Sequence, residues 1–193
     1  DKERLESLAR YLSRNVSMPP VYSAEERQSI IRQILLTSKE PCKLYALGKE
    51  LNVAESTISY DLQKAEPWFE KFGIQLHRKP GLGVYIEGSE KNIRAALADL
   101  LYENVTQEQL MEWLYVQSNR QREKLNSSIR TRLLNFIDPE WLFKIEQVIQ
   151  EFEHNRGYRM ADNAYVGFVV HLALAVQRLK MDEAITIEKA ILD

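Results

Sequence analysis

The fold is decided by residues 47–90, which read LGKELNVAESTISYDLQKAEPWFEKFGIQLHRKPGLGVYIEGSE. Apolar side chains recur at helical spacing over residues 43–51 and again over residues 55–65, and a short turn at residues 52–54 separates the two stretches. Two short helices with complementary apolar faces and such a turn predict a helix-turn-helix. The second helix of this arrangement is the one that can enter a DNA major groove.

The hydrophobic period changes after this pair of helices. Pro67 is predicted to begin a further short helix that stops at Gly73. Residues 74–78 then alternate apolar and polar side chains, residues 79–83 have the composition of a turn, and residues 84–86 are rich in strand-forming types. These segments predict a β-hairpin. A basic hairpin directly after a helix-turn-helix is typical of a wing, whose tip can lie along the phosphate backbone.

Helices are predicted on both sides of this module. Residues 1–15 have the spacing of a short amphipathic helix, and Ser23 followed by Glu26 is a capping-box pattern at the start of another. From Ser89 onward every strong signal is helical. The later helix starts are marked by the T-x-x-Q pattern at Thr106, by Asp138-Pro139 and by Asp162. The predicted fold class is therefore mainly α: a winged helix-turn-helix with a small hairpin, followed by an all-α domain.

The composition is that of a globular protein, with 45% hydrophobic and 28% charged residues. The single Cys42 excludes a disulfide framework and a cysteine-rich zinc site, and three histidines leave little for a metal, so we expect neither metal nor cofactor. No apolar run approaches the ~18 residues of a membrane span, so we expect a cytoplasmic protein without membrane insertion. The net charge is −2, and residues 23–88 carry 9 basic and 9 acidic side chains, so any DNA contact must be local.

The candidate DNA-contacting residues lie on the second helix and on the hairpin. Ile58 and Leu62 are expected to face the core, which turns the polar residues of that helix outward. Serine and glutamine can bond base edges, glutamine is suited to adenine, and lysine can meet a phosphate. The candidates are Ser56, Thr57, Ser59, Tyr60, Gln63 and Lys64 on the helix, and Arg78 and Lys79 on the hairpin. The alternatives are a solvated helix in a structural module and ordinary surface salt contacts on the hairpin.

Two segments resemble one group of transcription regulators. Residues 47–90 resemble the Mga-type winged helix of sugar-operon activators, and residues 158–180, YRMADNAYVGFVVHLALAVQRLK, are similar to the first half of a phosphotransferase-system regulation domain. Together the two resemblances cover most of residues 23–181. The combination looks like the mannitol-operon and lichenan-operon activators. The signature of the second segment is Asp162, Tyr165, His171-Leu172 and Arg178.

This resemblance implies a phosphorylation switch. Regulation domains of this kind are phosphorylated on histidine by phosphocarrier proteins, and the matching residue here is His171. From its apolar surroundings alone, His171 would be an ordinary core residue. Arg178 lies seven residues further on the same helix side and is expected to pair with the phosphate. His77 and His154 match no such motif and are expected at the surface.

The predicted elements and the resemblance together give the expected domain boundaries. Residues 1–22 are an N-terminal helix and linker, 23–88 the winged helix-turn-helix, 89–138 a helical connector, and 139–193 the first part of the regulatory domain. The chain begins with Asp1 rather than methionine, and we expect it to be a fragment of a longer regulator. Family members usually carry another helix-turn-helix upstream.

The recognition helix departs from the family pattern. Such helices commonly begin with a serine cap and several arginines, whereas this one reads Ala54-Glu55-Ser56 and then Ser59-Tyr60. Losing the cap costs about 1 kcal/mol, and losing arginines removes phosphate anchors. Weak or shared DNA binding is implied.

The sequence thus predicts a DNA-binding transcriptional regulator of a carbohydrate-uptake operon. Its expected partners are operator DNA, a phosphocarrier protein and sugar-specific phosphotransferase components. A homodimer is expected because the helix from Ala164 to Leu179 is apolar nearly all round. The alternative is an RNA-binding antiterminator of the same regulatory class, but those carry a small β module in place of a helix-turn-helix. An enzyme is not expected, since the sequence has neither a Gly-rich phosphate loop after a strand nor a nucleophile motif.

Overall fold

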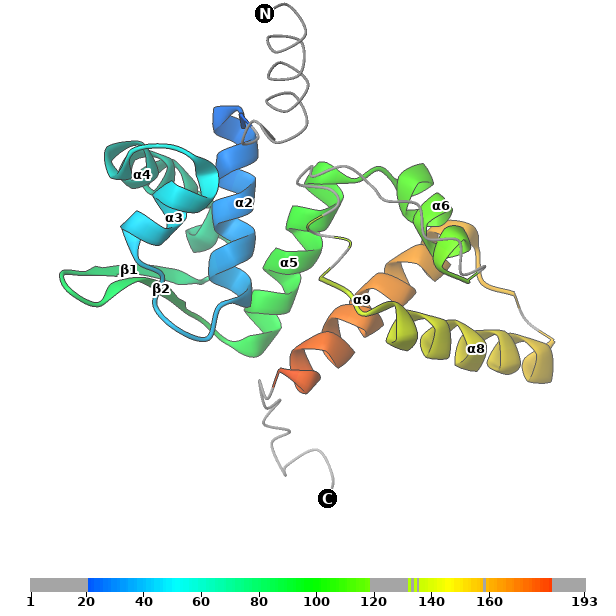
Figure 1. Ribbon diagram of the computed structural model, residues 1–193. Coiled ribbons are helices and arrows are strands. Elements are labelled where there is room, and N and C mark those ends of the chain that lie inside the picture. Colours follow the sequence, from blue (N-terminus) through cyan, green and yellow to red (C-terminus); the bar gives the residue numbers. More distant parts are fainter. Residues whose placement is uncertain (1–20, 119–131, 133, 135, 158, 182–193) are drawn as a thin grey trace, which may run out of the picture.

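The computed structural model describes residues 21–118, 132, 134, 136–157 and 159–181. The helix predicted over residues 1–15 lies outside the described residues. The helices are α2 (Ala24–Thr37), α3 (Leu44–Leu51), α4 (Glu55–Lys71), α5 (Glu90–Asn104), α6 (Gln107–Ser118), α8 (Pro139–Arg156) and α9 (Asp162–Lys180), and the strands are β1 (Gln75–Lys79) and β2 (Gly83–Glu87). Helices α2 to α4 gather with the hairpin at one end, α6, α8 and α9 lie at the other, and α5 runs between them (Figure 1). The predicted mainly α class with one small hairpin is confirmed.

Helix α2 begins with the predicted capping box. The Ser23 N–H donates to the Glu26 carboxylate at 2.9 Å, and the Glu26 N–H donates to the Ser23 hydroxyl at 3.2 Å. These bonds satisfy two of the N–H groups that a helix start leaves without partners. Its inward side carries Ile30, Ile31, Leu35 and Leu36, all buried.

Helix α4 runs without a break through Pro67, so the prediction that Pro67 begins a separate helix is wrong. A proline inside a helix lacks the N–H that bonds the carbonyl of the preceding turn. Packing offsets this cost, since Phe69, two residues later, is 0% exposed. The stop at Gly73 is confirmed: φ there is 65°, the Gly73 N–H donates to the Glu70 carbonyl at 2.8 Å, and the Ile74 N–H donates to that of Phe69 at 3.0 Å. This is a Schellman ending, in which glycine adopts the left-handed conformation.

The wing is anchored near its tip by a third segment. Strands β1 and β2 pair antiparallel, with Lys79 opposite Gly83 at the tip. Cys42 lies before α3, and its N–H donates to the Val84 carbonyl at 2.7 Å while the Val84 N–H donates back at 2.8 Å. A side chain at Gly83 would place its Cβ 2.5 Å from the Cys42 carbonyl oxygen, so this close approach requires glycine. The wing is therefore fixed to the loop that leads into α3.

Cap chemistry also places the later helices. Thr106 and Gln109 bond each other's N–H groups at 3.0 and 3.3 Å, and the Asp138 carboxylate accepts from the Glu140 N–H at 3.0 Å. Both predicted starts are confirmed. Asp162 is the first helical residue of α9 instead of its cap, which is Ala161. A carboxylate is favourable anywhere in the first turn, so the pattern alone does not separate these positions.

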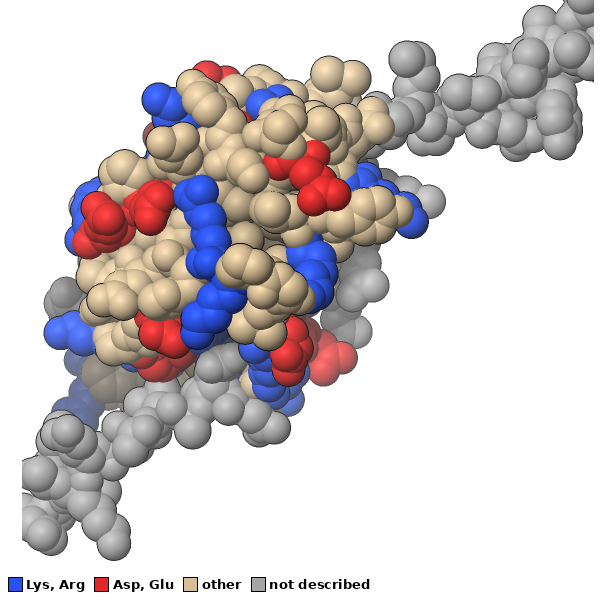
Figure 2. Space-filling model, turned by 90° about the vertical axis from the view of Figure 1, so that its left-hand side faces the viewer, with Lys and Arg blue, Asp and Glu red and all other residues tan. Residues whose placement is uncertain are grey.

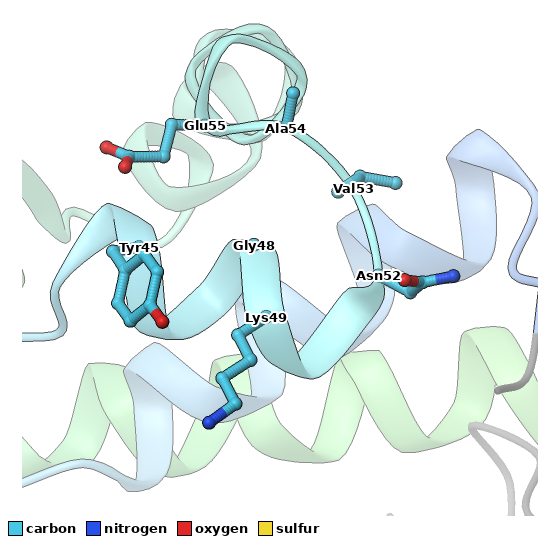
Figure 3. Close-up of a pocket in the computed structure, with 7 residues that line it drawn as sticks. All are labelled: Tyr45, Gly48, Lys49, Asn52, Val53, Ala54 and Glu55. Carbon is cyan, nitrogen blue, oxygen red and sulfur yellow. The ribbon is translucent and has the colours of Figure 1, made fainter.

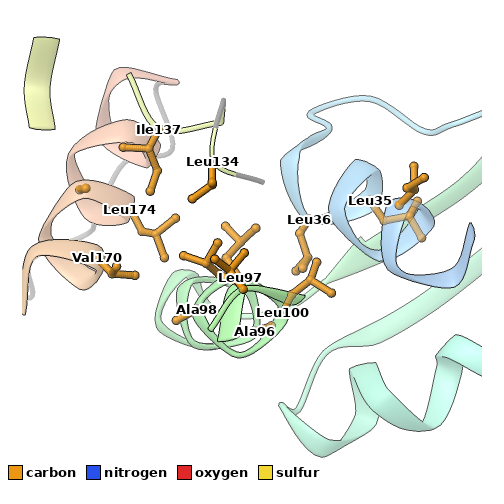
Figure 4. Close-up of a cluster of buried hydrophobic side chains, with 14 of the residues drawn as sticks. Leu35, Leu36, Ala96, Leu97, Ala98, Leu100, Leu134, Ile137, Val170 and Leu174 are labelled. Carbon is orange, nitrogen blue, oxygen red and sulfur yellow. The ribbon is translucent and has the colours of Figure 1, made fainter. Parts of the chain in front are cut away.

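Helix α5 is shared by both ends of the molecule. Its buried residues are Ala96, Leu97, Ala98, Leu100 and Leu101. It contacts both α2 and α9. In Figure 4, Leu36 of α2 lies over one side of α5, and Val170 and Leu174 of α9 lie toward its other side. One hydrophobic core therefore continues from the helix-turn-helix into the later helices.

A buried ion pair joins α2 to α4. Asp61 of α4 is 0% exposed, and Arg27 of α2 donates to its carboxylate through Nε at 2.8 Å and through Nη2 at 3.4 Å. The Gln28 side chain also donates to Asp61, at 3.5 Å. A buried carboxylate is stable only with such partners. Because Asp61 lies on the core side of α4, the pair helps to fix how α4 is turned about its own axis.

We expect Arg27→Met to lower the free energy of unfolding by about 3 kcal/mol or more, because Asp61 stays buried without its cationic partner. The matched control is Lys71→Met, which breaks the more exposed Lys71–Asp99 pair and should cost about 1 kcal/mol or less. Urea unfolding followed by circular dichroism measures both variants. Equal losses would contradict a special contribution of the buried pair.

Candidate nucleic-acid interface

Helices α3 and α4 meet in a tight turn that depends on Gly48. Asn52 takes the left-handed conformation, with φ of 55°, and the Val53 N–H donates to the Gly48 carbonyl at 2.9 Å. A Cβ on Gly48 would lie 2.8 Å from the Val53 carbonyl oxygen, so a larger residue would force the two helices apart. Figure 3 shows the turn around a shallow depression lined by Tyr45, Gly48, Lys49, Asn52, Val53, Ala54 and Glu55.

Helix α4 turns its apolar side inward and its polar side outward, as predicted. Ile58 and Leu62 are both 0% exposed. Tyr60 is 56% exposed on the other side, and the Lys64 ammonium lies 5.4 Å from the centre of its ring. Among the predicted residues, Ser56, Tyr60, Gln63 and Lys64 are exposed, and Thr57 and Ser59 are half-buried. The structure thus brings these six residues together on one accessible helix side.

The start of α4 has no side-chain cap. Its N-cap residue is Ala54, which makes no side-chain hydrogen bond, in agreement with the missing serine noted in the sequence. An uncapped helix start presents N–H groups and a partial positive charge, which favour an anion such as a phosphate. Glu55 opposes this attraction, since it lies exposed in the same turn.

The two predicted wing cations have partners within the protein. The Arg78 guanidinium pairs with Glu66 of α4 at 3.2 Å, with both side chains about 40% exposed. The Lys79 ammonium lies 5.2 Å from the centre of the Tyr85 ring, and its hydrogen bond to Tyr85 raises the pKa of Lys79. Both side chains lie exposed at the surface. Arg78 also ties the wing to the recognition helix, so a phosphate must compete with Glu66 for it.

Three further residues near the turn were missed in the sequence. Tyr45 of α3 is 66% exposed, and Lys49, one turn later, is exposed beside it (Figure 3). Lys43 is exposed, and its ammonium bonds the Gly81 carbonyl at the wing tip. Tyr45 and Lys49 are spaced by four residues and avoid the positions of the buried Leu47 and Leu51, which is the signal that could have identified them.

The charge on this side of the molecule is mixed. Figure 2 shows lysine and arginine side chains in a band near the middle of the face that α4 and the wing present, with aspartate and glutamate on either side of it. A uniformly basic surface, which dominates strong nonspecific DNA binding, is not what this face offers. Any DNA contact depends on a few local cations.

His171 lies in the middle of α9 with its side chain exposed. Its apolar neighbours in sequence had suggested a core position from chemistry alone. The buried positions of α9 instead recur at helical spacing, so that Val170 is 1% exposed while His171 lies on the outer side. An exposed imidazole is accessible to another protein. His154 is exposed as predicted, whereas His77 is half-buried, stacked on Tyr85 and 3.1 Å from the Glu87 carboxylate.

Arg178 has a different environment from the one predicted. It is 2% exposed, and its guanidinium bonds Glu90 of α5 and the Leu36 carbonyl of α2. Pairing with a phosphate at His171 would require Arg178 to leave these partners. No local pattern could predict these partners, since Glu90 and Leu36 lie 88 and 142 residues away along the chain.

The described residues contain no group of three or more His, Cys, Asp or Glu side chains arranged to hold a metal ion. Among the described helices, none has the length and apolar character needed to cross a membrane. The element placed beside the wing is a pair of helices, which does not favour the antiterminator alternative with its small β module.

Comparison with known proteins agrees with this arrangement. Residues 15–102 match the Mga helix-turn-helix domain. The chain is 24% identical over 168 residues to the transcriptional regulator ManR of Bacillus subtilis (strain 168), and 20% identical over 163 residues to the probable licABCH operon regulator of the same organism. These alignments cover 86% and 84% of this chain but only 22% and 23% of the two relatives. Residues 15–102 are therefore similar to a Mga helix-turn-helix domain, and most of the chain is similar to a part of these two regulators.

Proposed function

We propose that this chain is the part of a transcriptional regulator that reads operator DNA for a carbohydrate-uptake operon and couples that reading to phosphorylation. The observation that carries the proposal is the exposed polar side of α4, held beside a wing in a Mga helix-turn-helix domain. The names of the two relatives, a transcriptional regulator and a probable operon regulator, support it. Such a protein acts in the cytoplasm, where the bacterial chromosome lies.

Helix α4 supplies the base-reading groups. Gln63 suits the edge of an adenine, and the Ser56, Thr57 and Ser59 hydroxyls can donate to or accept from several bases. Tyr60 offers a ring for the thymine methyl and a hydroxyl for a phosphate. Lys64 lies at the outer margin of this side and meets the backbone.

The wing and the turn supply the phosphate contacts. Arg78 and Lys79 lie on β1, where they follow the backbone beside the groove, and Tyr45 and Lys49 flank the uncapped start of α4. These contacts are few and are partly engaged within the protein. The affinity of the chain for DNA is therefore modest and falls with salt.

Replacing Arg78 and Lys79 together by alanine should lower the slope of log K against log [salt] by about 1 to 2, because each phosphate contact contributes about 0.9. The assay is fluorescence anisotropy on duplexes that the protein itself selects from a random library. The matched control is Arg156→Ala with Arg159→Ala, which removes two exposed cations, one at the end of α8 and one just after it, and should leave the slope unchanged. Equal slopes in wild type and the wing variant would remove the wing from the interface.

The regulatory part of the proposal centres on His171. Its exposed position in α9 supports attack on the phosphohistidine of a phosphocarrier protein, a transfer that a buried ring would not allow. A phosphate on the imidazole adds negative charge and strong acceptors to this helix side. Sugar-specific phosphotransferase components complete the set of proposed partners.

Radiolabel from phosphoenolpyruvate, passed through the purified phosphocarrier chain, should appear on the wild type and on His77→Ala but not on His171→Ala. His77 is the control because it is held by Glu87 and Tyr85 on the wing. Label that persists in His171→Ala would assign the modification to another residue.

A homodimer through the later helices is the third part of the proposal. Val148 and Phe152 of α8 are 66% and 55% exposed, four residues apart on one helix side, and such an apolar surface favours a partner. A two-fold dimer would present two readers to a symmetric operator.

Sedimentation equilibrium should show a dimer for the wild type, and Val148→Glu should shift it toward monomer by placing charge in the interface. The control is Gln147→Glu, an exposed neighbour on α8. A wild type that stays monomeric at high concentration would contradict the proposed dimer.

A further inference from the structure

Arg178 connects three helices at a buried point. Its Nε and Nη2 donate to the Glu90 carboxylate, with the shortest bond 2.8 Å long, and its Nη1 donates to the Leu36 carbonyl at 2.8 Å. The arginine side chain is 3% exposed and that of Glu90 17% exposed. A planar guanidinium suits this task, since its fixed fork bonds a carboxylate and a carbonyl simultaneously.

The Arg178–Glu90 pair stabilises two helix ends, the end of α2 and the start of α5. Helix α2 has no basic residue of its own in its last turn, where free carbonyls carry partial negative charge. Arg178 supplies that cation from α9. Glu90 lies in the first turn of α5, whose partial positive charge favours a carboxylate. The ion pair is therefore bound to the end of α2 on one side and to the start of α5 on the other.

Arg178 is also physically linked to His171. The two residues are seven positions apart on one helix, and Val170 and Leu174 beside them are buried. A continuous helix moves as a rigid rod, so a displacement at His171 reaches Arg178. The hydrogen bonds that Arg178 makes to Glu90 and to the Leu36 carbonyl tolerate little change in length. A displacement of Arg178 must therefore move these partners as well, or the bonds must break.

The other end of α2 is attached to the recognition helix. Arg27, in the first turn of α2, holds Asp61 of α4. Helix α2 is therefore joined to α4 near its start, through Arg27 and Asp61, and to α9 at its end, through the Leu36 carbonyl and Arg178.

Resting on the proposed function, we propose that Arg178 is the positioning residue through which charge at His171 alters DNA binding. In this mechanism α9 acts on the end of α2 through Arg178, and α2 turns α4 through the Arg27–Asp61 pair. Arg178 touches neither DNA nor the phosphate. Its effect appears in the response to modification, whereas a merely structural residue would change stability and leave that response intact.

The test compares His171→Glu, a charged substitute for the modified residue, with His171→Gln, its neutral match. When Arg178 is kept, the Kd values of these two variants for the selected duplex should differ by a factor of about 5 or more, whichever variant binds more tightly. In Arg178→Met and in Glu90→Gln the ratio should fall to within about twofold of 1, and Arg178→Lys should retain part of it. Arg94→Met is the control, because Arg94 bonds Glu90 from within α5 and should leave the ratio unchanged.

A second measurement separates the coupling from the DNA proposal. Hydrogen exchange at residues 35–38 should differ between His171→Glu and His171→Gln with Arg178 present, and should not differ in Arg178→Met, with circular dichroism confirming that each variant is folded. That pattern without DNA binding would keep the coupling and reject the proposed function. A ratio that is unchanged in Arg178→Met and Glu90→Gln, or that equals 1 in the Arg178 background, would overturn the role of Arg178.

Discussion

The burial of α5 between α2 and α9 is the contact on which the rest of the structure depends. Residues Ala96 to Leu101 place leucines and alanines on both sides of this helix, and the alanines leave room for a neighbouring helix to approach closely. A polar linker would let the helix-turn-helix and the later helices move independently. A shared apolar core prevents such independent movement, because moving the helix-turn-helix away from the later helices would expose apolar side chains to water. The position of the helix-turn-helix is thus set partly by helices that lie outside it.

Buried charge adds direction to that apolar contact. Hydrophobic packing is roughly proportional to area and tolerates small rotations, whereas Arg27 with Asp61 and Arg178 with Glu90 require particular geometries. The cost of removing these groups from water is high, and their net contribution to stability is correspondingly small. Their contribution is to select one arrangement of α2, α4 and α9 among several that would bury similar area.

Sequence patterns predicted the elements that depend on neighbours along the chain. The capping box at Ser23, the stop at Gly73, the hairpin and the outward side of α4 all follow from spacings of four residues or fewer. Pro67 was misread because Phe69 packing, a tertiary effect, outweighs a local signal. The partners of Asp61 and Arg178 lie 34 and 88 residues away, and no local spacing encodes such a pair. The exposure of Tyr45 could have been read from helical spacing, and its nearness to the α4 start only from the fold.

The distance along the chain between Leu36 and Arg178 has a consequence during translation. The two residues are separated by 142 positions, and a ribosome adding about 5–20 residues per second needs about 7 to 28 seconds to cover them. The helix-turn-helix has left the exit tunnel and can fold well before α9 exists. Until then the end of α2 lacks its bond to Arg178, and the apolar side of α5 that later meets α9 is open to other nascent chains. The helix-turn-helix therefore folds first and is held by α9 only later. The time between these two events is when the protein is most exposed to misassembly.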